Sequence, residues 1–254
     1  CAIDSMMEAL FELYELDQTD LTLFATGGYG RGELHPFSDV DLLLLSPNPI
    51  DEALNQKISP FVARLWDIGI DPALVVRSVE ECDEACHDDI TVATSLLEAR
   101  ILAGNVAQAG LPMQLLNKNW SQTKFYEAKM AEAKARYVKH NSTEYNLEPD
   151  LKNAPGGLRD IHTVGWISKR YFRVTNLFGL VQQEFITEKE FDELQQAEDF
   201  LWLIRHHLHK IAKRNENRVL FDYQRLIAER IGYRDNSHPN AAVEHFMRDY
   251  YRYA

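Results

Sequence analysis

The sequence predicts an α+β fold, with a small mixed-sheet domain over residues 1–110 and an all-helical domain over residues 111–254. Two observations predict this division. Short apolar and β-branched segments alternate with helix-like segments in the first part of the chain, which is typical of a small sheet packed against helices. Later segments show the apolar spacing of helices and are separated by polar loops.

The first domain is expected to contain the elements helix, strand, strand, helix and strand, in that order. Gly27-Gly28 ends the first strand, and Ser46-Pro47-Asn48-Pro49 ends the second. The segment between these strands, 29–38, is expected to be a turn. The expected helices and strands cover residues 3–16 (helix), 21–26 (strand), 39–45 (strand), 51–68 (helix) and 73–79 (strand).

The second part of the sequence is expected to be helical apart from its loops. The segment 141–157 is polar and contains Pro149, Pro155 and Gly156-Gly157, so it predicts a loop. The basic end of one long helix includes His206 and His207, which face different directions and therefore do not favour a zinc site. That end is expected to be solvated and to complement the helix dipole. The expected helices cover residues 91–102, 113–120, 125–139, 158–172, 187–214, 223–231 and 240–253.

The charge balance excludes some classes of partner. The formal net charge is −12, from 39 acidic and 27 basic residues. A chain this acidic repels long nucleic acids unless its basic residues are clustered, but it can bind a small nucleotide through a divalent cation. No apolar run approaches the roughly 20 residues of a membrane span. Acidic residues in the first 16 positions do not fit a signal peptide. We therefore expect a cytoplasmic protein with no nucleic-acid or membrane partner.

Three cysteines do not make a disulfide framework. Cys82 and Cys86 are four residues apart and could share a helix face, with His87 close by. A zinc site would need further ligands, so two semi-buried thiols are the preferred interpretation.

A glycine-rich segment, Gly27-Gly28-Tyr29-Gly30-Arg31-Gly32, follows the first expected strand. Glycines allow positive φ and close backbone approach, and successive N–H groups in such a turn can form a concave site for phosphate oxygens. Hairpin turns also need glycine, so this segment alone is weak support for a phosphate site.

The second half of the motif is more specific. Asp39 and Asp41 are two residues apart in an apolar strand, so both side chains project from one face. Neighbouring carboxylates repel each other unless a cation lies between them, and Mg²⁺ favours carboxylates and shares phosphate ligands. The alternative is a pair of solvent-facing residues on an edge strand. The run Leu42-Leu43-Leu44-Leu45 predicts instead a strand buried on both faces, which would place the two carboxylates beside a cleft.

The string GGYGRGELHPFSDVDLLLL resembles the polymerase-β-type nucleotidyltransferase superfamily. It is closer still to the family of bifunctional uridylyltransferase/uridylyl-removing enzymes that modify the PII nitrogen-signalling protein. Three further segments carry the same resemblance, which therefore covers nearly the whole chain: 91–100 (TVATSLLEAR), 151–161 (LKNAPGGLRDI) and 217–224 (NRVLFDYQ).

The resemblance implies transfer of UMP from UTP to a tyrosine hydroxyl of the PII protein, with release of pyrophosphate. It implies a two-metal mechanism in which Asp39 and Asp41 hold Mg²⁺. Gly27, Gly28 and Ser38 would then hold the triphosphate.

Two basic residues are further candidates for binding the nucleotide. Arg31 would offset charge on the leaving pyrophosphate; the alternative is a turn arginine in solvent. Lys152 would contact phosphate from the helical domain, or else it is a loop lysine in water.

A third carboxylate usually completes such a site. Asp71, before Pro72 at the start of the third expected strand, is the candidate. Glu98 is the second choice, although it is expected to be a structural partner of Arg100 on a helix.

Three interpretations remain open. The chain is a PII uridylyltransferase domain, a related nucleotidyltransferase such as the adenylyltransferase of glutamine synthetase, or a non-catalytic docking module of the same fold. His87-Asp88 lacks accompanying histidines, so it does not indicate the hydrolase domain of the resembled family. The chain is therefore expected to be a fragment of a longer enzyme, without uridylyl-removing activity or glutamine sensing.

Overall fold

The structure is a computed structural model, and it describes residues 2–139, 146–174, 176–234, 237–238 and 240–254. The chain forms two compact units. The first contains the residues up to Leu34 together with Ser38–Ser121, and the second contains His35–Phe37 together with Gln122–Ala254. The units divide after Ser121, whereas a functional boundary at residue 110 stays a prediction.

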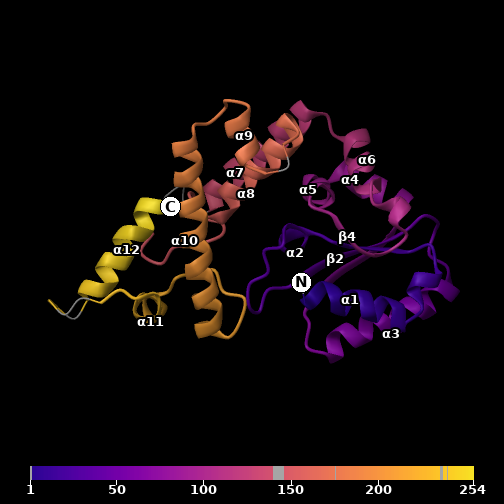
Figure 1. Ribbon diagram of the computed structural model, residues 1–254, viewed down its shortest axis with the longest axis horizontal. Helices are drawn as coiled ribbons and strands as arrows, with labels where there is room; N and C mark the ends of the chain where they lie inside the picture. Colours follow the sequence, from indigo (N-terminus) through magenta and orange to yellow (C-terminus); the bar gives the residue numbers. More distant parts are fainter. Residues whose placement is uncertain (1, 140–145, 175, 235–236, 239) are drawn as a thin grey trace. The chain divides into compact units, whose positions relative to one another are not determined.

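The first unit is built on one four-stranded mixed sheet with the strand order β3-β2-β1-β4 (Figure 1). β2 runs parallel to β3, whereas β1 is antiparallel to both β2 and β4. The strands are β1 (Thr22–Ala25), β2 (Val40–Ser46), β3 (Pro72–Ser78) and β4 (Arg100–Gly104). The sheet confirms the mixed-sheet fold expected from the sequence.

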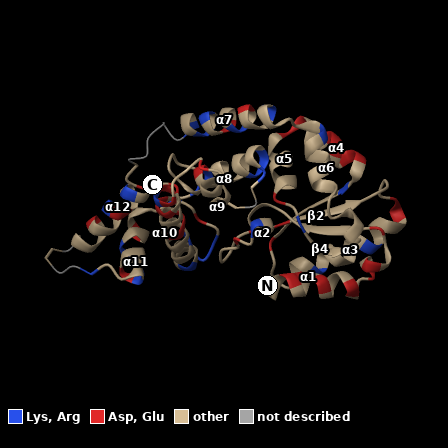
Figure 2. Ribbon diagram, turned by 45° about the horizontal axis from the view of Figure 1, so that its top comes forward, with Lys and Arg blue, Asp and Glu red and all other residues tan. Residues whose placement is uncertain are grey.

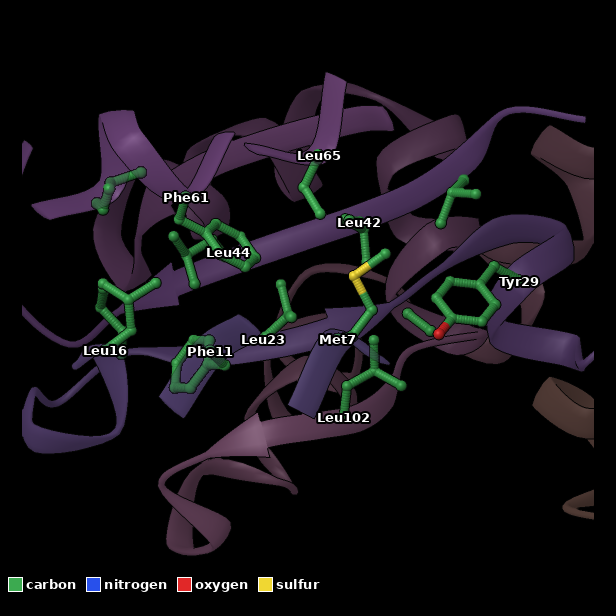
Figure 3. Packing of buried hydrophobic residues seen from close by; sticks show 14 residues of the cluster. Met7, Phe11, Leu16, Leu23, Tyr29, Leu42, Leu44, Phe61, Leu65 and Leu102 are labelled. Atoms are coloured by element: carbon green, nitrogen blue, oxygen red, sulfur yellow. The ribbon is translucent and has the colours of Figure 1, made fainter. Parts of the chain in front are cut away.

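Helices α1 (Ala2–Leu13) and α3 (Glu52–Asp67) supply the apolar side chains that cover one face of this sheet. Figure 3 shows this core, in which Phe11 and Phe61 meet edge to face with ring centroids 6.3 Å apart. Alternate residues of β2, Leu42 and Leu44, point into the core. The intervening residues of β2 therefore face the other side of the sheet, and Asp41 is one of them.

The remaining helices of the first unit follow β3 and β4. α4 (Val79–Asp88) begins with a capping box between Ser78 and Glu81. Trp120, directly after α6 (Leu111–Asn119), donates its indole N–H to the Cys86 carbonyl on α4, at 2.6 Å. α4 is not among the helix ranges expected from the sequence, although the spacing of Cys82 and Cys86 allows them to share a helix face. The elements after β3 are α4, α5 (Ile90–Leu97), β4, the short 3₁₀ helix η2 (Val106–Gln108) and α6 (Leu111–Asn119); another 3₁₀ helix, η1 (Leu16–Gln18), precedes β1.

Two sequence predictions for this unit are wrong. The glycine-rich segment was expected to be a turn, but Gly27–Arg31 forms a short helix, α2. A single helix was expected over 91–102, but α5 ends at Leu97 and Arg100–Gly104 pairs with β1 as β4. The apolar residues 101–103 are few enough to fit either a helix or a strand by spacing, and pairing with β1 decides between them.

The second unit is all-helical in its regular elements, as expected. Its core contains apolar residues of α8 (Leu158–Ile167), α10 (Glu188–Ala212), α11 (Phe221–Ile231) and α12 (Ala241–Tyr253). Figure 1 shows the course of these helices. The polar segment before α8 is a loop where it is described; residues 140–145 lie outside the described part. The helices are α7 (Gln122–Lys139), α8 (Leu158–Ile167), a π-helical turn η3 (Ser168–Phe172), α9 (Phe178–Gln182), α10 (Glu188–Ala212), α11 (Phe221–Ile231) and α12 (Ala241–Tyr253).

The charge pattern of α7 and the length and polarity of the helices limit their possible partners. Basic and acidic side chains are interspersed along α7 (Figure 2), so this helix does not present a surface of one sign. Across the described part of the chain, no helix combines the length and apolar character that crossing a membrane requires.

Candidate active site

The two halves of the sequence motif meet at the start of α2. Thr26 precedes this helix and donates its backbone N–H to the Asp41 carbonyl, at 3.0 Å. Gly27 has φ +53°, and a Cβ built on it would lie 2.2 Å from Oδ2 of Asp41. The Asp41 carboxylate therefore lies directly against the Gly27 backbone, where no larger residue fits.

Several groups around this contact suit an anionic ligand with a divalent cation. No side chain caps α2, so its first N–H groups are open to another acceptor. Asp39 is exposed, one residue before β2. The hydroxyl oxygen of Ser38 is buried and has no hydrogen-bond partner among the described residues. Carboxylate oxygens such as those of Asp39 and Asp41 are hard donors that fit a cation such as Mg²⁺ held together with phosphate oxygens.

Asp71 lies next to this site by strand register. Val40 pairs with Pro72 in the parallel ladder, and the Val40 N–H donates to the Asp71 carbonyl, at 2.9 Å. Continuing the ladder by one residue places Asp71 opposite Asp39, on the same face of the sheet. A metal-binding or catalytic role for Asp71 stays a prediction.

Arg31 is engaged by two acids within the first unit. Its guanidinium donates to Glu33 through Nε, at 2.6 Å, and to Glu98 through an Nη atom. Burial would lower the pKa of Arg31, but the Glu98 and Glu33 carboxylates outweigh it and hold the pKa above its usual value. Arg31 is thus not a turn arginine in open solvent: its side chain is 15% exposed. Charge stabilisation of a leaving pyrophosphate by this residue stays a prediction.

Glu98 has a different partner from the one expected. It pairs with Arg31, whereas Arg100 pairs with Asp4, with 3.1 Å between Nη2 and Oδ1. α2 also packs closely against the Glu98 backbone at Gly30. A Cβ at this position would lie 2.3 Å from the Glu98 carbonyl oxygen, so only glycine allows this approach. The expected pairing was wrong because β4 begins at Arg100 and leaves Glu98 in the junction after α5.

The segment that leads from the glycines to Asp39 packs in the second unit. His35–Phe37 belongs to that unit, and the His35 ring lies 4.2 Å from the Trp202 ring, centroid to centroid. His209 on α10 donates its Nδ1–H to the Pro36 carbonyl. Phe37 has φ +60°, which is strained for a residue with a side chain. These contacts fix the backbone just before Ser38, and no local sequence pattern indicates them.

Lys152 lies in a loop organised by Asp150. The Asp150 carboxylate accepts the backbone N–H of Lys152, at 2.8 Å, and that of Asn153, at 2.7 Å. The Lys152 carbonyl in turn accepts the Arg159 N–H at the start of α8, at 2.8 Å. The backbone at Lys152 is therefore well held, and the predicted phosphate contact of its side chain stays a prediction.

A pocket of about 420 Å³ lies on the same face of the sheet as Asp41. It is mostly apolar and lies between the strands β2 and β3 and the helices α4 and α5. No local sequence pattern indicates this pocket, although the period-2 pattern of β3 places Ala73, Val75 and Arg77 on one face. The lining residues are Thr26, Asp41, Leu42, Leu43, Pro72, Ala73, Leu74, Val75, Arg77, Cys82, Thr91, Val92, Ser95 and Leu96.

Cys82 and Cys86 do not form a metal site with His87. Neither cysteine forms a disulfide and both are buried, whereas His87 is exposed and pairs with Asp88, with 2.9 Å between Nδ1 and Oδ1. Burial raises the pKa of Cys82 to about 11, so it stays a neutral thiol in the pocket wall. This agrees with the preferred interpretation of two buried thiols.

Two protein-family models match the chain. A nucleotidyltransferase domain matches residues 6–94, and the GlnD PII-uridylyltransferase family matches residues 124–254. Nucleotidyltransferase domains generally use divalent metal ions, which agrees with the oxygen donors around Asp41.

Curated relatives match the whole chain. A bifunctional uridylyltransferase/uridylyl-removing enzyme of Psychrobacter sp. (strain PRwf-1) is 62% identical over 100% of this chain and 28% of its own length. The enzyme of the same name from Acinetobacter baumannii (strain ATCC 17978) is 51% identical over 99% of this chain and 29% of its own length. The chain thus spans less than a third of these relatives.

A solved toxin–antitoxin structure with AMP-PNP gives a weaker match. It is 17% identical, covers 53% of this chain and 96% of that one, and has a TM-score of 0.31. A likeness at this level carries no conclusion about the site.

Proposed function

The chain belongs to the GlnD PII-uridylyltransferase family, and from that membership we propose that it transfers UMP from UTP to a tyrosine hydroxyl of the PII signal protein and releases pyrophosphate. The observation that carries the proposal is the contact between Asp41 and Gly27. It joins an acidic strand to the open start of a helix, which is the combination that a metal-bound triphosphate needs.

Each residue of the site has a role in this proposal. Asp39 and Asp41 hold Mg²⁺, with Asp71 as the third carboxylate. When bound, the ions neutralise the triphosphate and stabilise the attacking and leaving oxygens. The backbone of Gly27 and Gly28 and the hydroxyl of Ser38 hold the phosphates.

Two basic residues complete the assignment. Arg31 supports the leaving pyrophosphate from its position between Glu33 and Glu98. Lys152 contacts a phosphate of the nucleotide. The protein works in the cytoplasm and without a nucleic-acid substrate.

The test is transfer of label from UTP to PII protein by Asp39→Asn and Asp41→Asn variants of the full-length protein that carries these residues. We expect at least about a hundredfold loss of transfer, because each carboxylate contributes to charge stabilisation in the transition state. The melting temperature should stay the same or rise, because removing one carboxylate relieves repulsion from the other. Transfer at near parental rates by either variant would show that the site is assigned wrongly.

The acceptor and the base need a separate comparison. UTP, ATP, CTP and GTP, each labelled, are offered with PII protein or with glutamine synthetase. Label on PII protein from UTP alone supports the proposal. Adenylylation of glutamine synthetase would assign the chain to the related adenylyltransferases. Metal-dependent nucleotide binding without transfer to either acceptor would identify a docking module.

A further inference from the structure

The pocket beside Asp41 extends from Thr26, which directly precedes α2, across β2 to β3. β1, which leads into α2, neighbours β2 on one side, and β3 neighbours β2 on the other. Gly27 at the start of α2 contacts the Asp41 carboxylate, while Asp41 itself lines the pocket over β2 and β3. Asp41 therefore lies between the proposed phosphate site at Gly27 and the part of the pocket that covers β3.

Phosphoryl-type transfer determines what can occupy this pocket. The attacking and leaving oxygens lie roughly in line, on opposite sides of the reacting phosphorus. In the proposed function the pyrophosphate leaves toward the backbone of Gly27 and Gly28. The attacking hydroxyl must then approach from the opposite side, which is the side of β3. The nucleoside is attached through a different oxygen of the same phosphorus, so it is not held on the line of attack.

The chemistry of the lining suits an aromatic side chain followed by an acidic one. Near Asp41 the floor is apolar, formed by Leu43, Ala73 and Val75, and Val75 is 42% exposed. Such a surface binds the ring of an aromatic residue. Arg77 lies at the other end of the pocket and pairs with Leu45 in the parallel ladder. At about 3.3 Å per residue, Arg77 lies roughly 13 Å from Ala73 along β3.

Arg77 is the cation that the pocket offers to a partner. It is partly buried, and within the described residues it makes no hydrogen bond or ion pair. It acts at longer range on Glu81, whose carboxylate already accepts the Ser78 N–H and hydroxyl in the capping box. An arginine in this setting can still donate to an incoming carboxylate in a bidentate manner.

We propose that this pocket is the acceptor subsite: it takes the hydroxyl-bearing aromatic side chain of the acceptor protein against Leu43, Ala73 and Val75, and Arg77 pairs with a carboxylate near that side chain. The inference rests on the proposed function, because the line of attack is defined by the phosphate site at Gly27.

The step balances within the proposed reaction. The acceptor hydroxyl oxygen forms a bond to the α-phosphorus of UTP. The bond from that phosphorus to the oxygen bridging the β-phosphorus breaks, and pyrophosphate leaves with its electron pair. The hydroxyl proton passes to a carboxylate of the site or to water.

The first experiment compares Arg77→Gln with Arg64→Gln in the full-length protein. Arg64 is an exposed arginine on α3, the helix that packs on the opposite face of the sheet, so it is a matched control. We expect Arg77→Gln to raise the KM for PII protein about tenfold or more, as loss of a charge pair at an interface does. The KM for UTP and the metal-dependent binding of UTP should stay unchanged. Arg64→Gln should match the parental protein in all three.

The second experiment tests the occupant of the pocket. Val75→Trp fills the floor and should suppress transfer to PII protein while metal-dependent UTP binding persists. Arg77→Glu should also suppress transfer, and PII protein with a lysine in place of an acidic residue beside the modified tyrosine should restore it.

Three outcomes would overturn the inference. The first is a raised KM for UTP in Arg77→Gln. The second is that both Arg77→Gln and Val75→Trp modify PII protein with parental kinetics. The third is that no lysine-substituted PII protein restores transfer by Arg77→Glu. Failure of the proposed function looks different. There, the parental protein itself labels no PII protein, or Asp41→Asn labels it as well as the parental protein does.

Discussion

At the scale of single residues, the contact between Gly27 and Asp41 links the two halves of the motif. The carboxylate occupies the space that a side chain on residue 27 would need. Gly28 differs, because its φ is not positive and a Cβ there would meet only ordinary contacts, the nearest at 3.5 Å from the Glu33 carbonyl oxygen. Two adjacent glycines therefore serve different purposes: one accommodates Asp41, and the other leaves the backbone open to a ligand.

Alanine substitutions at Gly27 and Gly28 should distinguish the structural role of the first from the ligand-binding role of the second. Gly27→Ala should destabilise the first unit by about 1–3 kcal/mol from backbone strain, and it should lower kcat because the Asp41 carboxylate is displaced. Gly28→Ala should fold normally, or gain up to about 1 kcal/mol from helix propensity, yet raise the KM for UTP. Thermal unfolding and steady-state kinetics measure both. A Gly28→Ala variant with a parental KM would remove Gly28 from the phosphate site.

Arg31 and Glu98 allow a double-mutant cycle at the same scale. Arg31→Gln deprives Glu98, whose side chain is 3% exposed, of a cationic partner. Breaking such a pair costs about 3–5 kcal/mol where both groups are buried, so we expect a loss of up to this size. Glu98→Gln in the same chain should restore much of the stability. If the double variant regains both UMP transfer and stability, the role of Arg31 is structural. If stability returns without transfer, Arg31 also acts on the nucleotide.

At the scale of elements, α10 contacts residues 35 and 36, which lie shortly before β2. Its residues Leu201, Ile204 and Leu208 point into the core of the second unit. On the same helix, Trp202 and His209 contact His35 and Pro36. α10 itself begins with a capping box between Thr187 and Glu190. The backbone at His35 and Pro36 therefore depends on a helix far away in the sequence.

The burial of His209 predicts a pH dependence of stability. Burial lowers the pKa of His209 below its usual 6.5. Because the folded pKa is below the unfolded one, the stabilisation is present above about pH 6.5 and is lost as the pH falls toward the folded pKa. The slope is at most about 1.4 kcal/mol per pH unit for one proton. We expect the melting temperature to fall between pH 7 and pH 5.

Two glutamine variants test this assignment. His209→Gln keeps a side-chain donor for the Pro36 carbonyl but cannot titrate, so its melting temperature should fall less over the same pH range. His87→Gln is the control, since the His87 side chain is 66% exposed; it should follow the parental curve. Equal slopes for His209→Gln and the parental protein would show that His209 does not control the acid sensitivity.

Sequence periodicity predicted most elements because each has a clear apolar face. Leu42 and Leu44 point into one core while Leu43 and Leu45 are buried on the other side, as the four-leucine run indicated. The failures have physical causes. α2 begins with two glycines, whose poor helix propensity is overridden by packing of Gly30 against the Ala25 and Glu98 carbonyls. Residues in the pocket and the support of Pro36 by α10 depend on tertiary contacts that no local pattern encodes.

At the scale of the whole molecule, a net charge of −12 works against binding a triphosphate. The site adds two carboxylates, Asp39 and Asp41, to this unfavourable field. A divalent cation reverses the sign of the local potential, because it is the largest charge in such a site. Binding of the cation and of UTP should therefore be strongly coupled, each depending on the presence of the other.

This coupling predicts the response to metal removal. UTP with Mg²⁺ should stabilise the full-length protein by about 2.7 kcal/mol at a concentration one hundred times Kd, because only the folded chain binds it. UTP with EDTA should leave the melting temperature unchanged, as should Mg²⁺ alone at the same low concentration. Asp41→Asn should abolish the shift, while Arg64→Gln, distant on α3, should retain it. An equal shift with UTP in EDTA would mean that the nucleotide binds through basic side chains such as Lys152, without the cation that the acidic pair is proposed to hold.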